Sequence, residues 1–311
     1  MTQDRPALGI FLLFGFLILA PLGDAIAKII GDRMALAQVV MMRMAFQALL
    51  LLPIVWLAGL NWRFGRAETL WVLARSLLHM FGIAVMFLSL RYLPIADAIA
   101  IAYVMPFIML VLGRFFLDEE VGKRRIIACL VGFTGTLMVV QPSFAEVGWP
   151  AFLPLVVAVD FALFMMVTRK VAKSIDPISL QAVSGLIACA ILLPAMLLLQ
   201  PFQFQEVRFH NASFDVWKLV FGIGVLGTVA HLLMSWSLRY APSTTLAPMQ
   251  YLEIPIATVY GWLIFSDFPN GLAFGGIVVT MGAGLYIVFR ENAVSRQARS
   301  KPSEVQTGAE G

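Results

Sequence analysis

The sequence predicts an all-α membrane protein whose ten transmembrane helices form two inverted five-helix repeats. Three observations lead to this prediction: the composition, the spacing of the apolar segments, and a block of sequence that recurs 148 residues later. Of the 311 residues, 60% are hydrophobic and only 13% are charged, whereas soluble globular chains contain about 45–50% apolar and about 25% charged residues. This composition argues against a soluble enzyme, a nucleic-acid-binding module and a disordered scaffold.

Ten apolar segments alternate with short polar breaks, and a membrane helix needs about 20 mostly apolar residues. We expect five helices at Ala7–Ile30, Ala35–Leu57, Leu70–Leu90, Ile95–Phe116 and Ile126–Val140. We expect the other five at Trp149–Thr168, Ile178–Leu199, Val216–Leu238, Thr244–Phe265 and Leu272–Phe289. The polar residues 291–311 that follow predict a disordered cytoplasmic tail.

The distribution of basic residues predicts how these helices are oriented. With the N-terminus inside the cell, fifteen of the 22 Lys and Arg residues fall in inner connections and five in outer ones. Connections that stay in the cytoplasm are enriched in Lys and Arg. The first apolar segment is too long for the core of a signal peptide, so we expect it to be retained. The prediction is a multi-pass protein of the cell inner membrane with both termini in the cytoplasm.

A repeated block indicates that the chain contains two copies of one unit. Ser89–Pro94 (SLRYLP) recurs at Ser237–Pro242 (SLRYAP). The same offset pairs Tyr103 with Tyr251, Gly113 with Gly261, and Glu119 with Asp267. It also brings two ridges of small residues into register, Ala128-Gly132-Thr136 and Gly276-Thr280-Gly284. Small residues let helices approach closely in lipid, so we expect both ridges to be buried.

The number of helices between the two copies has a topological consequence. The repeated block ends the third apolar segment and the eighth, which are five segments apart. Because five is odd, the two copies must insert into the membrane in opposite orientations. Inverted repeats of this kind are typical of secondary transporters, whose substrate sites lie near the middle of the bilayer between the repeats.

The two halves, residues 7–141 and 149–290, resemble the paired EamA domains of the drug/metabolite transporter superfamily. The residues that carry the resemblance are the repeated RYxP step, Pro106 leading to Leu117-Asp118-Glu119, and Pro255 leading to Phe265-Ser266-Asp267. Asp267 stands where the second copy more usually has Glu. The resemblance implies a ten-helix inner-membrane transporter of amino acids, nucleotide-related metabolites, vitamins or drugs. It also implies a cavity lined by the first, third, fourth, sixth, eighth and ninth helices.

Glu253 is the first candidate for a site residue, because a charge within a membrane helix is costly and usually faces a cavity or a partner. It lies between Pro248 and Pro255, which break the backbone hydrogen bonds of the ninth segment and can open the helix around it. Gln250 lies one turn away on the same stripe. The carboxyl group could bind a proton or a cationic substrate. The alternative is a structural salt bridge to Arg43 or Arg75.

Arg75 and His79 are one turn apart in the third segment and share a helix face. Arg75 could hold a carboxylate or phosphate of the substrate, with His79 as a hydrogen-bonding or proton-relay partner. Alternatively, both neutralise buried carboxylates between helices. Arg43 in the second segment leaves the same two interpretations open.

Four further residues are weaker candidates. Asp160, in the middle of the sixth segment, could act in gating or proton transfer, or could be a structural carboxylate with hydrogen bonds. Tyr103 and Tyr251 could line the cavity, but Tyr251 can do so together with Glu253 only if the prolines distort the segment. We expect Asp24 to pair locally with Lys28, and His231 to make a hydrogen bond between helices.

These observations favour secondary-active transport of a small polar or amphipathic metabolite by alternating access, with export of an amino-acid-like metabolite as the first expectation. The alternative is uptake of a vitamin or nucleoside-like metabolite of the riboflavin or S-adenosylmethionine class. A channel or an intramembrane enzyme is a remote alternative, since we find no nucleophile–base pair or metal cluster. We expect membrane lipid and a small-molecule substrate as partners, and no nucleic acid.

We also expect no cofactor, metal or ATP. Cys129 and Cys189 stand alone, without the Cys/His pattern of a metal site. No GxxxxGK[ST] loop for ATP is present. The GxGxxG match at Gly222–Gly227 lies within an apolar segment and follows no strand, so it predicts helix packing.

Overall fold

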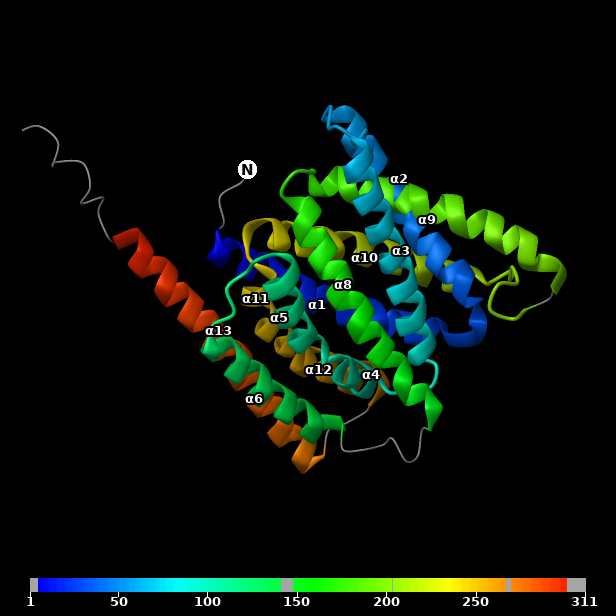
Figure 1. The fold of residues 1–311 in the computed structure, drawn as a ribbon. Coiled ribbons are helices and arrows are strands. Elements are labelled where there is room, and N and C mark those ends of the chain that lie inside the picture. The colour runs from blue at the N-terminus through cyan, green and yellow to red at the C-terminus, as the bar shows by residue number, and fades with distance from the viewer. Residues whose placement is uncertain (1–4, 141–147, 203, 267–269, 301–311) are drawn as a thin grey trace, which may run out of the picture.

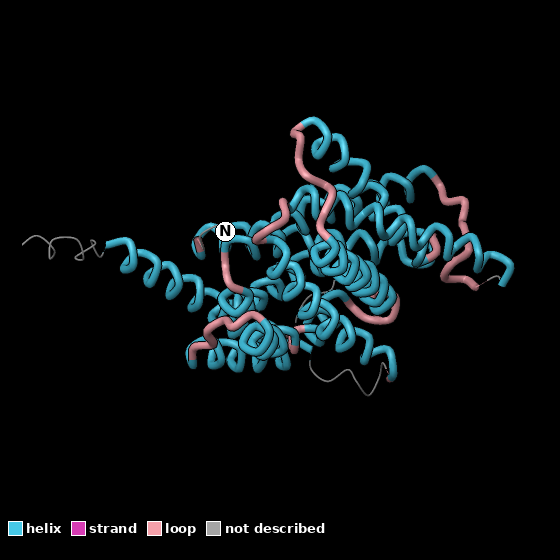
Figure 2. Tube along the Cα trace, turned by 45° about the horizontal axis from the view of Figure 1, so that its top comes forward, coloured by secondary structure: helices cyan, strands magenta, loops and turns pink. Residues whose placement is uncertain are grey.

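In the computed structural model, the described residues are 5–140, 148–202, 204–266 and 270–300. Within these ranges the chain is helical, with short connections and no strand (Figure 2). The first half contains α1 (Pro6–Ile30), α2 (Leu36–Leu57), α3 (Arg66–Ser89), α4 (Ile95–Ala102), α5 (Met105–Phe116) and α6 (Lys123–Val140). The second half contains α8 (Leu153–Ala172), α9 (Pro177–Leu199), α10 (Phe214–Tyr240), α11 (Ser243–Leu246), α12 (Glu253–Phe265) and α13 (Gly271–Ser300). Short 3₁₀ helices lie at Gly31–Arg33, Trp149–Phe152, Gln200–Phe202 and Ala247–Leu252.

Seven helices in the described part of the chain are long and apolar enough to cross a membrane. They comprise α1, α2, α3, α9, α10 and, with its preceding 3₁₀ turn, α8, together with the apolar part of α13. The other three expected segments are also helical but differ from a continuous apolar span. The fifth, α6, begins with three consecutive basic residues, Lys123 to Arg125, and the fourth and ninth are broken.

The breaks in the fourth and ninth segments fall at matching positions. Helix α4 ends at Ala102 and α5 begins at Met105, with Pro106 in its first turn, where the missing N–H of proline is tolerated. The ninth segment consists of α11, the 3₁₀ helix Ala247–Leu252 and α12. Tyr103 and Tyr251, which the sequence offset pairs, lie at these two irregular places. The ninth segment is therefore distorted, which its two prolines allow.

The strongest helix contacts join the two halves of the chain rather than neighbours in sequence. Helix α1 packs on α10, α2 on α9, α3 on α8, and α6 on α13. Figure 1 shows α6 and α13 side by side at one edge of the bundle, with α2 and α9 at another. The two halves are therefore interleaved.

Burial follows the pattern of a protein whose solvent is lipid. Arg75, Thr168 and Gln181 are inaccessible inside the bundle, whereas Trp56 is 79% exposed on its outside. Polar groups are turned inward because hydrocarbon offers them no hydrogen bonds.

The two small-residue ridges are buried, as predicted. A methyl group added at Gly132 would meet the ring of Tyr251, and one added at Gly284 would meet Leu252. Between the two helices, a methyl at Gly135 would lie 2.8 Å from the carbonyl oxygen of Gly276. These glycines bring α6 and α13 close to each other and to the irregular part of the ninth segment.

The structure corrects part of the predicted tail. Residues 291–300 continue α13 instead of being disordered, because they are rich in helix-forming Ala, Arg, Gln and Glu and contain no Gly or Pro. Residues 301–311 lie outside the described residues.

Candidate functional site

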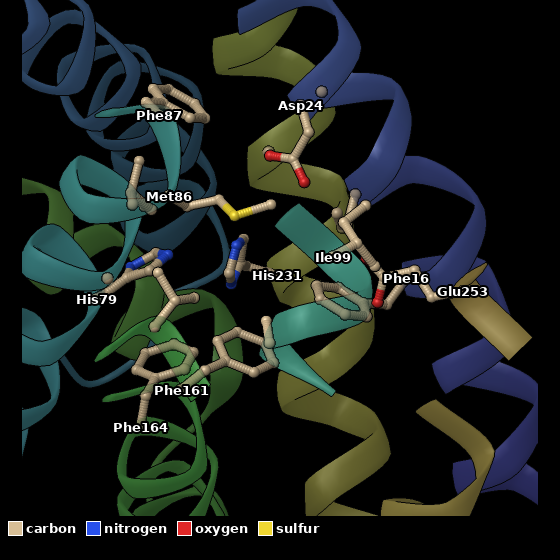
Figure 3. Close-up of a pocket in the computed structure, with 18 of the residues that line it drawn as sticks. Phe16, Asp24, His79, Met86, Phe87, Ile99, Phe161, Phe164, His231 and Glu253 are labelled. Atoms are coloured by element: carbon tan, nitrogen blue, oxygen red, sulfur yellow. The ribbon is translucent and has the colours of Figure 1, made fainter. Parts of the chain in front are cut away.

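The main cavity lies between α1, α3, α8 and α10, with α4 and the start of α12 closing one side. The volume of this cavity is about 130 Å³. Its polar lining residues are Asp24, Arg43, His79, Tyr103, Asp160, His231 and Glu253. Its aromatic lining residues include Phe16, Phe87, Phe161 and Phe164. Figure 3 shows the two histidine rings and the rings of Phe161 and Phe164 toward one end, with Asp24 toward the other.

His79 and His231 form a pair at the end of the cavity where Phe161 and Phe164 lie, which we call the aromatic end. Their ring centroids are 4.3 Å apart, and the His79 ring stacks on Phe164 at 4.8 Å. Phe16 meets the His231 ring edge-on at 5.6 Å. Among the described residues, neither ring nitrogen of His79 has a hydrogen-bond partner, and Nδ1 of His231 has none. Nδ1 therefore does not make the hydrogen bond between helices that the sequence predicts for His231.

Asp160 and Arg43 each lie against a glycine. A methyl group at Gly82 of α3 would collide with the Asp160 carboxylate, and one at Gly227 of α10 would lie 2.6 Å from the Arg43 guanidinium. Both oxygens of Asp160 and Nη1 of Arg43 are buried and have no hydrogen-bond partner in the part of the chain that the structure describes. The absence of a side chain at the two glycines makes room for these charged groups at the cavity wall.

Glu253 is held by Tyr103, across the cavity from His79 (Figure 3). The Tyr103 hydroxyl donates a 2.7 Å hydrogen bond to Oε2 of Glu253, and Tyr251 donates one of 3.2 Å to the carbonyl oxygen of Tyr103. These two hydrogen bonds join the broken fourth segment to the broken ninth segment. No ion pair among the described residues joins Glu253 to Arg43 or Arg75.

Arg75 lies outside the cavity lining, although it shares a helix face with His79. Its guanidinium donates to the hydroxyls of Thr168, at 2.9 Å, and Ser184, at 2.8 Å, and stacks on Phe164 at 4.7 Å. It is fully buried. Arg75 therefore supports the aromatic end of the cavity from behind, and its hydrogen-bond acceptors among the described residues are hydroxyl groups rather than carboxylates.

Two other expectations change. Tyr251 and Gln250 are fully buried but do not line the cavity; the Gln250 amide lies 3.5 Å from the sulfur of Met165. The 3₁₀ geometry of residues 247–252 turns them away from the stripe that an ideal helix predicts. Lys28 donates to the carbonyls of Leu90 and Leu93, and Asp24 lines the cavity. No ion pair between Asp24 and Lys28 is present among the contacts of the described residues.

The sequence analysis did not identify the aromatic part of the site. Phenylalanine is frequent throughout this chain, and its lipid-facing and cavity-facing copies have the same local sequence pattern. Asp24 carried a signal, an acid within a membrane helix, but the nearby Lys28 supplied a simpler explanation. Among the described residues, no group of three or more His, Cys, Asp or Glu side chains is arranged to hold a metal ion.

A sequence profile of the EamA-like transporter family matches residues 7–141 and 148–290 of this chain. The chain belongs to the EamA-like transporter family. Its membership rests on both halves, since each is matched separately.

Curated relatives of this EamA-like chain include proteins named for transport in both directions. An S-adenosylmethionine uptake transporter of Rickettsia felis is 26% identical over 94% of this chain and 96% of the relative. A riboflavin transporter of Brucella anthropi is 24% identical over 70% of this chain and 75% of the relative. A pseudopaline exporter of Pseudomonas aeruginosa is 24% identical over 83% and 88%.

A protein of solved crystal structure shares the fold of this EamA-like chain. The two superpose with a TM-score of 0.68 over 95% of this chain and 98% of the other, at 14% sequence identity. The similarity extends over both halves and supports the arrangement of the helices.

Proposed function

We propose that this chain is a secondary-active transporter that carries a small amphipathic metabolite across the membrane by alternating access. The observation that carries the proposal is the convergence of buried, unpartnered polar atoms on the main cavity. These atoms belong to Arg43, His79, Asp160 and His231. A substrate with polar groups would supply the missing hydrogen bonds, and its apolar part would pack on the surrounding Phe rings.

We also propose that residues 7–141 and 149–290 are repeats of opposite orientation in the inner membrane, with both termini in the cytoplasm. The helix contacts support this proposal. Exchanging equivalent helices of the two halves converts the α1–α10 contact into the α8–α3 contact, and both contacts are present. The same exchange maps the α2–α9 and α6–α13 contacts onto themselves. A pseudo-two-fold axis that relates the two halves produces this pattern, and because the copies are an odd number of segments apart, that axis would lie in the membrane plane.

The substrate that this cavity favours combines a planar ring with charged groups. The rings of Phe16, Phe161 and Phe164 offer stacking surfaces, and Asp160 offers a carboxylate for a cationic group. Uptake of a metabolite of the riboflavin or S-adenosylmethionine class fits these features. The relatives named for riboflavin and S-adenosylmethionine support the same choice.

Export of an amino-acid-like metabolite is the second candidate. The observation in its favour is that one cavity presents both a guanidinium, from Arg43, and a carboxylate, from Asp160. A zwitterion requires one group of each sign. The relative named as a pseudopaline exporter adds support.

A binding and counterflow experiment tests the proposal. The purified protein is screened for thermal stabilisation by S-adenosylmethionine, riboflavin and amino acids. Counterflow of each stabilising ligand is then measured in proteoliposomes. We expect saturable exchange that His79→Ala abolishes and that His210→Ala, a change in an exposed connection, leaves intact. Flux that does not saturate would indicate a channel, and the absence of any stabilising ligand or exchange would contradict the proposed function.

A further inference from the structure

A second hollow lies at the end of the bundle that carries Arg5, Arg125 and Arg169, which we call the basic end. Its volume is about 560 Å³, and it shares no lining residue with the main cavity. Helix α8 contributes Phe164 to the main cavity and Arg169 to the second hollow. Five residues of α-helix span about 7.5 Å, so the layer between the hollows is thin along this helix.

Glu119 lies in the lining of the second hollow and makes four polar contacts. Its carboxylate accepts hydrogen bonds from the Ser243 hydroxyl at 2.8 Å and from the backbone N–H groups of Ser243 at 3.1 Å and Thr244 at 2.9 Å. Arg169 Nε lies 3.4 Å from Oε1 of Glu119, and both side chains are at least nine-tenths buried. Glu119 belongs to the first half of the chain, and these partners all belong to the second.

Arg169 and Arg125 make further hydrogen bonds at the basic end. Arg169 donates to the carbonyl oxygens of Leu238, at 2.7 Å, and Arg239, at 3.2 Å, at the end of α10. Arg125 donates to the hydroxyls of Thr244 and Thr245 at 3.1 and 2.6 Å. The corner between α10 and α11 is thus held from the first half by Glu119 and Arg125, and from α8 by Arg169.

At the opposite end of the bundle, Gln38 of the first half exchanges two hydrogen bonds with the backbone of His210 in the second half, and the ion pairs are more exposed. There Arg91 pairs with Glu206 at 2.9 Å and Asp32 at 3.4 Å, whose side chains are 47% and 74% exposed. Exposed ion pairs contribute little because solvent screens them, whereas a buried charge that loses its partner is strongly unfavourable. At the offset of 148, Ser243 and Thr244 correspond to Ile95 and Ala96, which have no hydroxyl.

The main cavity extends toward that opposite end. Along α1 its lining runs from Phe16 to Asp24, and along α3 from His79 to Phe87. Both helices run from the basic end to the opposite end, so the lining stops at about the level of the histidines on the basic side.

We propose that Glu119, bound to Arg169, Ser243 and Thr244, is the gate that closes the substrate path at the basic end. Release of the carboxylate joins the second hollow to the main cavity. The proposal rests on the main cavity being the transport site, and it assigns to Glu119 the control of which side that site faces.

Distances between spin labels test the gate without any substrate. In a variant with Cys129 and Cys189 replaced by Ala, one label pair is placed at Asp118 and Lys173 on the second hollow. Another pair is placed at Asp32 and Arg208 at the opposite end. We expect Glu119→Gln to raise the population with a longer basic-end distance roughly tenfold, about the effect of losing one charge-assisted hydrogen bond. The opposite-end distance should shorten in parallel.

Glu120→Gln is the matched control, because it removes the same charge one residue away and leaves the bonded carboxylate of Glu119 in place. It should behave like the parent. Arg169→Gln should shift the distances in the same direction as Glu119→Gln.

If both gate variants give the distances of the parent, or if neither yields a monodisperse protein, the cluster is structural and the gate proposal is wrong. Failure of the proposed function would give a different result. The gate variants would still shift both distances, but the protein would bind no ligand and catalyse no exchange.

Discussion

Three of the ionisable side chains that reach the main cavity lie against glycine or aromatic neighbours. Asp160 lies on Gly82, Arg43 on Gly227, and His79 on the ring of Phe164. A charge at the centre of a membrane helix costs roughly 2.5–3.5 kcal/mol on insertion scales. Keeping such groups in the membrane therefore costs free energy, which the binding of a substrate or a proton in the cavity would offset.

Glu253→Gln tests the role of the acid on the ninth segment. The amide oxygen can still accept the hydrogen bond from Tyr103, so we expect a folded protein. Because the amide cannot exchange a proton, substrate exchange should lose its dependence on pH. Counterflow measured across pH 5 to 8 checks this expectation.

Tyr103→Phe provides the companion measurement for Glu253. It removes the hydroxyl but keeps the charge, so the pH profile should shift rather than flatten. A Glu253→Gln protein with the rate and pH profile of the parent would contradict the proposed proton-coupling role and leave the histidine pair as the alternative.

Asp160→Asn tests the binding of a cationic group. Hydrogen bonds to a charged group are worth about 1.5–3 kcal/mol, so affinity for a cationic ligand should fall roughly tenfold to a hundredfold. Isothermal titration with whichever ligand stabilises the parent measures the change. Asp215→Asn, at an exposed site paired with Lys218, is the control and should be neutral. Equal affinities of both variants would place the cationic group elsewhere.

At the scale of helices, the broken fourth and ninth segments meet the closely packed α6 and α13. The ring of Tyr251 occupies the space above Gly132, and Leu252 occupies the space above Gly284. The small-residue ridges thus do more than bring two helices together. They accommodate the side chains of a 3₁₀ segment that immediately precedes Glu253.

Gly284→Leu should destabilise the protein, because its side chain would displace Leu252 and overpacking typically costs about 1–3 kcal/mol. Gly282→Leu, on the same helix, meets nothing within 4 Å and should leave the melting temperature unchanged or slightly higher. Thermal unfolding in one detergent compares the two variants. Identical melting temperatures would show that the packing at Gly284 contributes no stability.

Much of this level could be predicted from the sequence. Hydrophobic length predicts helices at the ten apolar segments, of which seven in the described part of the chain are long and apolar enough to cross a membrane. Small residues at helical spacing predict the buried ridges, and both signals are local. The partner of Glu253 could not be predicted in the same way, because Tyr103 lies 150 residues away. The offset that pairs Tyr103 with Tyr251 was the only hint that these segments meet. The break between α4 and α5 has a local cause at Pro106, but that proline does not by itself distinguish a break from a kink.

At the scale of the whole molecule, the two ends of the interleaved bundle are joined by different contacts. The sequence shows an excess of basic residues at one end, which predicts the orientation in the membrane. It does not predict that two of those residues, Arg125 and Arg169, join the two halves there. That function depends on the contacts of Arg125 with Thr244 and Thr245 and of Arg169 with Glu119, and only the fold brings these segments together.

The orientation of the bundle can be tested directly. A reporter enzyme that is active only in the periplasm, fused after Arg290, should be silent, since the basic end is expected in the cytoplasm. The same reporter fused in the connection at Glu206 should be active. Activity of the first fusion and silence of the second would reverse the orientation and place the second hollow outside the cell.

The 3₁₀ helix Ala247–Leu252 is longer and more tightly wound than an α-helix of the same six residues would be. A 3₁₀ helix rises about 2.0 Å per residue and an α-helix about 1.5 Å. Conversion of these six residues to α-helix would therefore shorten the segment by about 3 Å and unwind it by about 120°. Such a change would move Ser243 and Thr244 along the helix axis and rotate them about it relative to Glu253. It would therefore couple the two ends of the bundle mechanically.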